Sequence, residues 1–173
     1  MDSKKQIRIY IIEDNNVFAL MLKSDIANIF EYLPVKIELF ESGEKCKQRF
    51  IEEKPQVVIL DYHLNTKYPD AANGIEILDW IKKKKYDTNV IMLTNVDNIE
   101  IVSLALNHGA SDYVVKTETK FKKINYSLFN LFKLIDAKRE VKKYKRYIAG
   151  LLFLLAIGIA GAFLFFLKLK SLI

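Results

Sequence analysis

The chain alternates short, continuous apolar runs with longer stretches in which apolar residues recur every three to four positions. The run Val57 to Leu60 leads directly into Asp61, a residue that is poor in strands and unfavourable to bury when ionised. Continuous apolar runs of this length are typical of strands buried on both faces of a parallel sheet. The sequence predicts five such strands, at Ile7–Ile12, Val35–Phe40, Val57–Leu60, Asn89–Leu93 and Asp112–Val115.

An amphipathic helix is predicted after each strand. The first begins near Val17, with Asn15 or Asn16 as its N-cap, and the others cover residues 43–53, 75–84, 99–108 and the chain from about Thr119 onward. Strict alternation of strands and helices predicts an α/β fold. We expect an open, doubly wound, five-stranded parallel sheet with the flavodoxin-like strand order 2-1-3-4-5.

Residues 148–167 have a different pattern from the rest of the chain. They read IAGLLFLLAIGIAGAFLFFL, with no charged or polar side chain. At 1.5 Å per residue, a helix of this length covers about 30 Å, the thickness of the hydrocarbon core of a bilayer. A soluble protein would need a large body around such a helix to bury it on all sides. The segment is therefore predicted to be a transmembrane helix.

The positive charge of the chain is concentrated beside this apolar segment. Residues 1–132 carry 18 basic and 19 acidic residues, whereas residues 133–147 carry seven basic and two acidic residues. The net charge of +6 therefore does not indicate a nucleic-acid-binding face, and no direct nucleic acid partner is expected. By the positive-inside rule, the N-terminal side stays in the cytoplasm.

These patterns predict four parts: a domain over residues 1–132, a basic juxtamembrane helix over 133–147, the span over 148–167 and a short tail over 168–173. We expect a single-pass protein of the inner (plasma) membrane, with membrane lipids among its partners. The N-terminus has no apolar stretch long enough for a secretory signal. Cys46 is the only cysteine, so no internal disulfide can form.

Polar or charged residues that could act together directly follow four of the five predicted strands. Glu13 and Asp14 come after the first strand, Asp61 after the third, Thr94 after the fourth and Lys116 after the fifth. The carboxyl ends of parallel strands share one edge, where three carboxylates would raise one another's pKa unless a cation lay among them. Mg²⁺ prefers oxygen ligands and leaves a coordination position for a phosphoryl oxygen. The sequence therefore predicts a Mg²⁺ site that handles phosphate.

This set of residues resembles the response-regulator receiver domain of two-component signalling (CheY-like). The matching motifs are the acidic pair in "IIEDN", the acceptor in "VVILDYHL", the hydroxyl in "IMLTN" and the lysine in "GASDYVVK". They occur at the ends of the expected strands and in the expected order. The resemblance extends from about Gln6 to about Asn130, three-quarters of the chain.

The resemblance implies that Asp61 accepts a phosphoryl group from a phosphohistidine of a sensor histidine kinase or a phosphotransfer protein. It implies Mg²⁺ bound by Asp14, Asp61 and the backbone carbonyl of His63, with Glu13 acting on the ion through water. Receiver domains are phosphoacceptors that promote their own phosphorylation and dephosphorylation, so no separate enzymatic activity is expected.

The resemblance also assigns roles to the hydroxyl, the lysine and an aromatic residue. Lys116 would offset the charge of the acyl phosphate. Thr94 would move toward a phosphoryl oxygen, and Tyr113, at the position of the family's aromatic switch, would follow it inward. Tyr113 as ordinary packing on an outer strand is the alternative.

Four features depart from the family pattern. Thr117 follows the lysine where proline is usual, so no cis peptide is expected there. Asn95 follows Thr94 in place of a small residue that admits phosphodonors. The loop from Tyr62 to Asn73 is about five residues longer than usual, and His63 lies where the side chain commonly tunes the lifetime of the phosphoryl group. His108, by contrast, is expected to be structural.

The leading hypothesis is a membrane-tethered receiver without an output domain of its own, acting through protein contacts. Helix pairing through the span or the receiver would make a homodimer, since Ala156 and Ala160, and Gly158 and Ala162, have small-xxx-small spacing. The alternative is a pseudo-receiver that serves as a membrane-bound interaction scaffold and does not cycle phosphate. A flavin-binding domain of the same fold is disfavoured because the acidic loop after the first strand repels phosphate.

Overall fold

The computed structural model describes residues 6–64, 72–85, 87–95 and 98–170, with side chains described up to residue 161. The chain forms two compact units, Met1–Leu131 (the N-terminal unit) and Phe132–Ile173 (the C-terminal unit), and the last helix runs through both.

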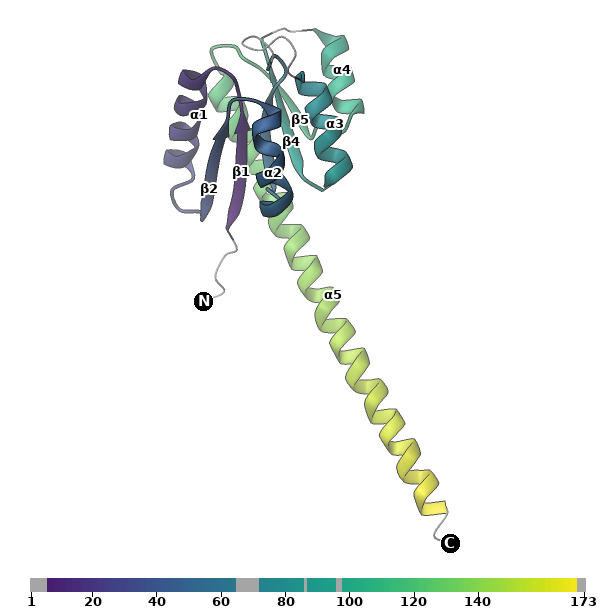
Figure 1. Ribbon diagram of the computed structural model, residues 1–173. Helices are drawn as coiled ribbons and strands as arrows, with labels where there is room; N and C mark the ends of the chain where they lie inside the picture. The colour runs from purple at the N-terminus through teal and green to yellow at the C-terminus, as the bar shows by residue number, and fades with distance from the viewer. Residues whose placement is uncertain (1–5, 65–71, 86, 96–97, 171–173) are drawn as a thin grey trace. The chain divides into compact units, whose positions relative to one another are not determined.

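A five-stranded parallel sheet forms the centre of the N-terminal unit (Figure 1). The strand order is β2-β1-β3-β4-β5, which confirms the predicted fold class and the predicted order. The strands are β1 (Ile7–Ile12), β2 (Val35–Phe40), β3 (Val57–Asp61), β4 (Asn89–Thr94) and β5 (Asp112–Val115).

Two strands are one residue longer than the sequence predicted. Pairing continues at the carboxyl edge, where Asp61 lies opposite Leu93 and Thr94 opposite Val115. The polar residues Asp61 and Thr94 are thus the last residues of their strands and not the first residues of the loops. The ladder fixes their backbones, which positions the two side chains at the edge of the sheet.

A helix follows each strand, and the local sequence explains where the helices begin. The helices are α1 (Asn16–Ile29), α2 (Gly43–Glu53), α3 (Gly74–Lys84), α4 (Ile99–Asn107) and α5 (Lys120–Lys170). Asn15, one of the two predicted caps, accepts hydrogen bonds from the first turn of α1, and Ser42 caps α2. Asn73 and Glu76 form a capping box at the start of α3.

The core lies on both faces of the sheet because successive strand residues point to opposite sides. One face packs Tyr10, Leu60 and Met92 against buried residues of α2, α3 and α4. The opposite face is covered by α1 and the first part of α5, which are joined by a hydrogen bond from Asn125 to Asp25. In β3, all five residues are buried, so both layers hold this strand in place.

Gly74 allows α3 to start close to the end of β3. A Cβ atom at this position would lie 2.5 Å from the carbonyl oxygen of Asp61 and 2.6 Å from the Cα atom of Tyr62. The amide of Gly74 donates a hydrogen bond to the carbonyl of Tyr62. Glycine is therefore needed here for a close approach of two backbones, and that approach supports the strand end that carries Asp61.

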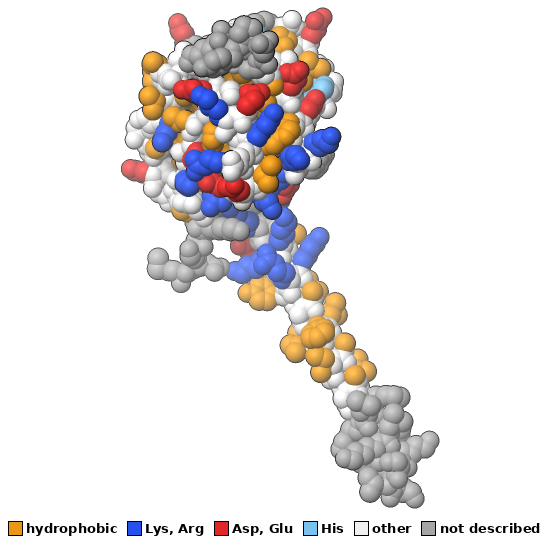
Figure 2. All heavy atoms as spheres, in the orientation of Figure 1, with side chains coloured by type: hydrophobic (Ala, Val, Ile, Leu, Met, Phe, Trp, Pro, Cys, Tyr) orange, Lys and Arg blue, Asp and Glu red, His pale blue; other side chains and the backbone are white. Residues whose placement is uncertain are grey.

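The C-terminal unit is one continuous helix, the part of α5 that follows Leu131. Basic residues are concentrated before Ile148, and the described surface from Ile148 to Gly161 has no charged side chain (Figure 2). The large apolar side chains between Ile148 and Ile159 are all more than half exposed. Among the described residues, α5 is the helix whose length and composition suffice to cross a membrane.

Candidate functional site

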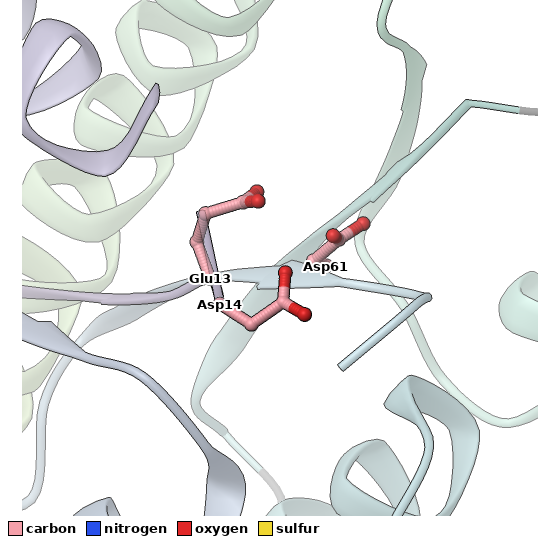
Figure 3. A group of neighbouring side chains, drawn as sticks. All are labelled: Glu13, Asp14 and Asp61. Atoms are coloured by element: carbon pink, nitrogen blue, oxygen red, sulfur yellow. The ribbon is translucent and has the colours of Figure 1, made fainter. Parts of the chain in front are cut away.

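Three acidic side chains meet at the carboxyl edge of the sheet (Figure 3). Glu13 and Asp14 directly follow β1, and Asp61 ends the neighbouring strand β3. One carboxylate oxygen from each lies within 4.8 Å of the other two. All three residues are buried, with exposed fractions of 2%, 6% and 2%. Such a concentration of negative charge is stable only with compensating positive charge.

Lys116 supplies part of that compensation. Its ammonium lies 2.7 Å from Glu13 Oε2 and 2.8 Å from Asp61 Oδ2. The backbone holds it there, since the amide of Lys116 donates to the carbonyl of Thr94 at 2.7 Å. One lysine thus contacts two carboxylates, one directly after β1 and one at the end of β3, and the three carboxylates outnumber this single ammonium.

Burial controls the ionisation of two of these carboxyl groups. Desolvation, reinforced by the charge of Asp61, raises the pKa of Glu13 to about 7, although Lys116 opposes the rise. The pKa of Asp61 is also raised, chiefly by burial, again against the effect of Lys116. For both groups we place the net direction upward, because a single ammonium cannot balance several desolvated carboxylates.

The residues fit a hard divalent cation. They offer carboxylate oxygens, the ligand type that Mg²⁺ prefers, from three side chains that converge on one space. Asp61 Oδ1 is buried and has no hydrogen-bond partner of good geometry among the described residues. A buried carboxylate oxygen of this kind is satisfied by a cation, and a divalent ion would also relieve the repulsion within the cluster.

The carboxylates open into a cleft of about 620 Å³. Its walls include His63 and Asn95, two of the positions at which the sequence departs from the family pattern. Asn95 thus lies beside the carboxylates, and its effect on the access of phosphodonors stays a prediction. The peptide after Lys116 is trans, because no described peptide bond is cis. The insertion between Tyr62 and Asn73 falls mostly at residues 65–71, outside the described residues.

The two predicted switch residues, Thr94 and Tyr113, lie in different surroundings. Thr94 is fully buried at the end of β4, next to the strand that carries Asp61. Tyr113 is half-buried and packs against the core on the α2–α4 side. The switching role of Tyr113 stays a prediction. The same holds for the carbonyl of His63 as a metal ligand.

The residues outside the cluster have structural contacts. His108 is the C-cap of α4, and its Nδ1 atom lies 2.6 Å from Asp79 Oδ1 on α3. Cys46 is buried, and desolvation raises the pKa of its thiol to about 12, which makes it a poor nucleophile at neutral pH.

Sequence reasoning missed an aromatic and cationic group at the mouth of the cleft. The Lys116 ammonium lies 4.8 Å from the centre of the Phe18 ring, and Phe18 stacks on Phe121 with 5.6 Å between ring centres. Lys120 lies 5.9 Å from the Phe18 ring and lines the same cleft. Phe18 follows Asp14 by four residues and Lys120 follows Lys116 by four, so each lies on the first turn of a helix that begins at the site.

A doubly wound sheet with a buried acidic cluster and a lysine at its carboxyl edge defines a class of phosphate-handling α/β domains. The sequence matches the family described as "Response regulator receiver domain" over residues 9–125. The chain belongs to this family.

Individual relatives agree with this assignment. The chain is 28% identical over 145 residues to the probable C4-dicarboxylate response regulator DctR of Bacillus subtilis, covering 84% of this chain and 55% of that protein. The receiver domain of a LuxO repressor protein from Vibrio parahaemolyticus superposes with a TM-score of 0.67 at 26% identity, over 79% of this chain and 97% of that one. The BeF3-activated DrrB receiver domain, from a Thermotoga maritima protein, superposes with a TM-score of 0.62 at 25% identity. The match covers 74% of this chain and 98% of that one. The chain spans about half the length of the first two curated relatives it matches.

Proposed function

We propose that this protein is a receiver that accepts a phosphoryl group on Asp61 from a phosphohistidine, in Mg²⁺-dependent two-component signalling at a membrane. The observation that carries the proposal is the buried convergence of Glu13, Asp14 and Asp61, with Lys116 within 2.8 Å of two of them. Neither packing nor solubility requires three carboxylates at such a place, whereas phosphoryl transfer does.

The chemistry follows from the residues of the chain. Asp61 attacks phosphorus, the bond between phosphorus and the histidine nitrogen breaks, and the imidazole leaves, so the product is an acyl phosphate on Asp61. Glu13, Asp14, Asp61 and the carbonyl of His63 would hold Mg²⁺, which supplies positive charge and a coordination site for a phosphoryl oxygen. Lys116 can exchange one carboxylate contact for a phosphoryl oxygen, and Thr94 can offer its hydroxyl from the neighbouring strand.

Small-molecule phosphodonors test this proposal. Acetyl phosphate with Mg²⁺ should increase the mass of the protein by one phosphoryl group. Beryllofluoride with Mg²⁺ should shift the NMR signals of backbone amides around β4 and β5. Asp61→Asn keeps the side-chain shape and should abolish both effects. If the native protein responds no more than Asp61→Asn does, the phosphoacceptor function is wrong.

A scaffold that never cycles phosphate is the second candidate, and Asn95 favours it. This side chain lines the cleft where the family usually has a small residue, and in this hypothesis it blocks the entry of a phosphodonor. The scaffold hypothesis predicts no phosphorylation of the native protein and none of Asn95→Ala. Phosphorylation that is slow in the native protein and faster in Asn95→Ala would instead make Asn95 a brake on a functioning site.

The proposed tether is the apolar part of α5. Its support is the exposure of the large apolar side chains between Ile148 and Ile159, together with a composition that suffices to cross a membrane. Thirteen of residues 148–167 are Leu, Ile or Phe, each favouring insertion by about 0.3 to 0.6 kcal/mol. We propose a single span with the receiver in the cytoplasm. The protein should stay with membranes during alkaline carbonate extraction, and a chain ending at Tyr147 should not. Release of the full chain would disprove the tether.

A further inference from the structure

The surface of α5 beyond Leu131 carries an apolar pattern that phosphoryl chemistry does not use. Charged residues predominate between Lys133 and Tyr147, yet apolar residues recur there at spacings of three and four and continue into the apolar segment with the same rhythm. We call these positions the α5 seam: Leu134, Ala137, Val141, Tyr144, Ile148, Leu151 and Leu155.

The seam is exposed where water would surround it. Leu134 is 44% exposed, Val141 54% and Tyr144 64%, although all three lie in a stretch rich in lysine and arginine. An ordered row of exposed apolar side chains on a polar helix indicates a surface that is covered by a partner. A purely solvated juxtamembrane helix would need no such row.

The spacing of the seam specifies the kind of partner. Steps of three and four residues average 3.5 residues, the repeat of a left-handed coiled coil, in which Leu134, Val141, Ile148 and Leu155 take a positions. A straight helix has 3.6 residues per turn and drifts by about 20° per heptad from this repeat. The seam therefore fits another helix that supercoils with it, and a flat lipid surface or a globular domain fits it less well.

Charges beside the seam favour a second copy of the same helix in parallel orientation. Glu140 takes a g position of the heptad, and Lys145 takes the following e position. In a parallel pair, Glu140 of each chain therefore lies opposite Lys145 of the other chain. Lys133 and Lys138 would form a like-charge pair one heptad earlier. The attractive contacts thus lie in the half of the basic stretch that leads into the span.

The small residues of the apolar segment follow the same seam. Gly158 falls on the seam, and a Cβ atom added there would have no neighbour within 4 Å along its own chain. By spacing, Ala162 takes the next seam position, whereas Ala156 and Ala160 do not lie on the seam. Small residues let helices approach closely inside a bilayer, where packing rather than the hydrophobic effect drives association.

We propose that two copies of this chain pair in parallel along the α5 seam, so that the tether is a two-stranded coiled coil running from Leu134 into the membrane. This inference rests on the membrane tether proposed above, because two chains inserted in the same orientation can pair only in parallel. The pairing would bring two receivers together independently of phosphorylation.

Cysteine cross-linking of the full chain in lipid vesicles tests the seam. Cys46, the native cysteine, is buried, and Cys46→Ala removes it as a background. In that background, Val141→Cys and Tyr144→Cys lie on the seam, while Lys142→Cys and Arg146→Cys lie off it within the same turns. With copper phenanthroline as the oxidant, the seam variants should form a species of twice 20.1 kDa at least five times faster than the off-seam variants. Maleimide labelling of reduced samples controls for thiol accessibility.

Two outcomes overturn the inference: equal cross-linking at all four positions, and no cross-linking at any of them. Carbonate extraction of the same vesicles separates this failure from failure of the tether, because an inserted chain that does not cross-link contradicts only the seam. A charge swap gives a second measurement. Glu140→Lys should slow cross-linking of Val141→Cys several-fold, and adding Lys145→Glu should restore it. Failure of the swap to restore the rate would contradict the parallel register.

Discussion

In the N-terminal unit, charged side chains as distant in sequence as Glu13 and Lys116 meet in a buried cluster, whereas in the C-terminal unit a basic stretch and an exposed apolar stretch follow one another along a single helix. The first arrangement exists only because the sheet brings strand ends together. The second depends on the spacing of apolar residues within a single helix, and in our proposals these residues are buried by lipid or by another chain. The same kind of substitution should therefore have different consequences in the two units.

The largest effect is expected at the lysine of the cluster. Lys116→Gln leaves the three buried carboxylates without this ammonium and removes the cation that faces the transferred phosphoryl group in the proposed mechanism. Losing one such preorganised charge typically slows a reaction by about 10²- to 10³-fold, and we expect phosphorylation by acetyl phosphate to fall by about 100-fold. Lys120→Gln is the matched control, since Lys120 lines the cleft without a described carboxylate contact, and it should lose less than fivefold. Equal losses would mean that general positive charge, and not the position of Lys116, matters.

The next comparison makes one substitution in each unit. Gly74→Ala places a Cβ atom 2.5 Å from the carbonyl oxygen of Asp61, and the backbone would have to shift. Overpacking of this kind lowers the free energy of unfolding by about 1 to 3 kcal/mol. The unfolding transition of the N-terminal unit in urea measures this change. Gly150→Ala on α5 meets nothing within 4 Å and should be neutral or slightly stabilising for the helix. Two equal effects would mean that Gly74 acts through helix propensity rather than through close approach.

The third prediction concerns pH and Mg²⁺. Because the pKa of Glu13 is raised from its ordinary value of 4.5 to about 7, the folded protein without metal holds a proton that the unfolded chain has lost. This contribution to stability is full below pH 4.5 and disappears as the pH rises to about 7. Mg²⁺ competes with that proton, so its affinity should fall by up to about tenfold per pH unit below pH 7. Titration calorimetry at pH 6 and pH 8 measures the affinity for Mg²⁺, with Glu13→Gln as the control.

The Glu13→Gln control has its own expected result. Glutamine carries no titratable proton, so the pH dependence of Mg²⁺ affinity should become flatter than in the native protein. An unchanged slope would assign the proton to the other shifted carboxyl group, Asp61.

Sequence patterns predicted the sheet well because its strands are short, continuous apolar runs, and β3 is buried along its full length. They also placed Glu13, Asp14, Asp61 and Lys116 at one edge, since parallel strands end together. They could not show that Lys116 contacts two carboxylates, because which contacts form depends on side-chain geometry. They missed Phe18 for a related reason: a phenylalanine in the first turn of a helix is compatible with many environments.

Phe18 provides the smallest expected effect and the finest test of the buried cluster. Its ring lies 4.8 Å from the Lys116 ammonium and stacks on Phe121, so we expect it to act on the reaction through the position of the lysine. Cation–π contacts contribute about 0.5 to 2 kcal/mol, and Phe18→Leu, which keeps an apolar side chain, should slow phosphorylation by about two- to tenfold. Phe18→Tyr keeps the ring and should retain the native rate. If Phe18→Leu and Phe18→Tyr slow the reaction equally, the ring does not act through Lys116, and the cluster ends at its four polar residues, Glu13, Asp14, Asp61 and Lys116.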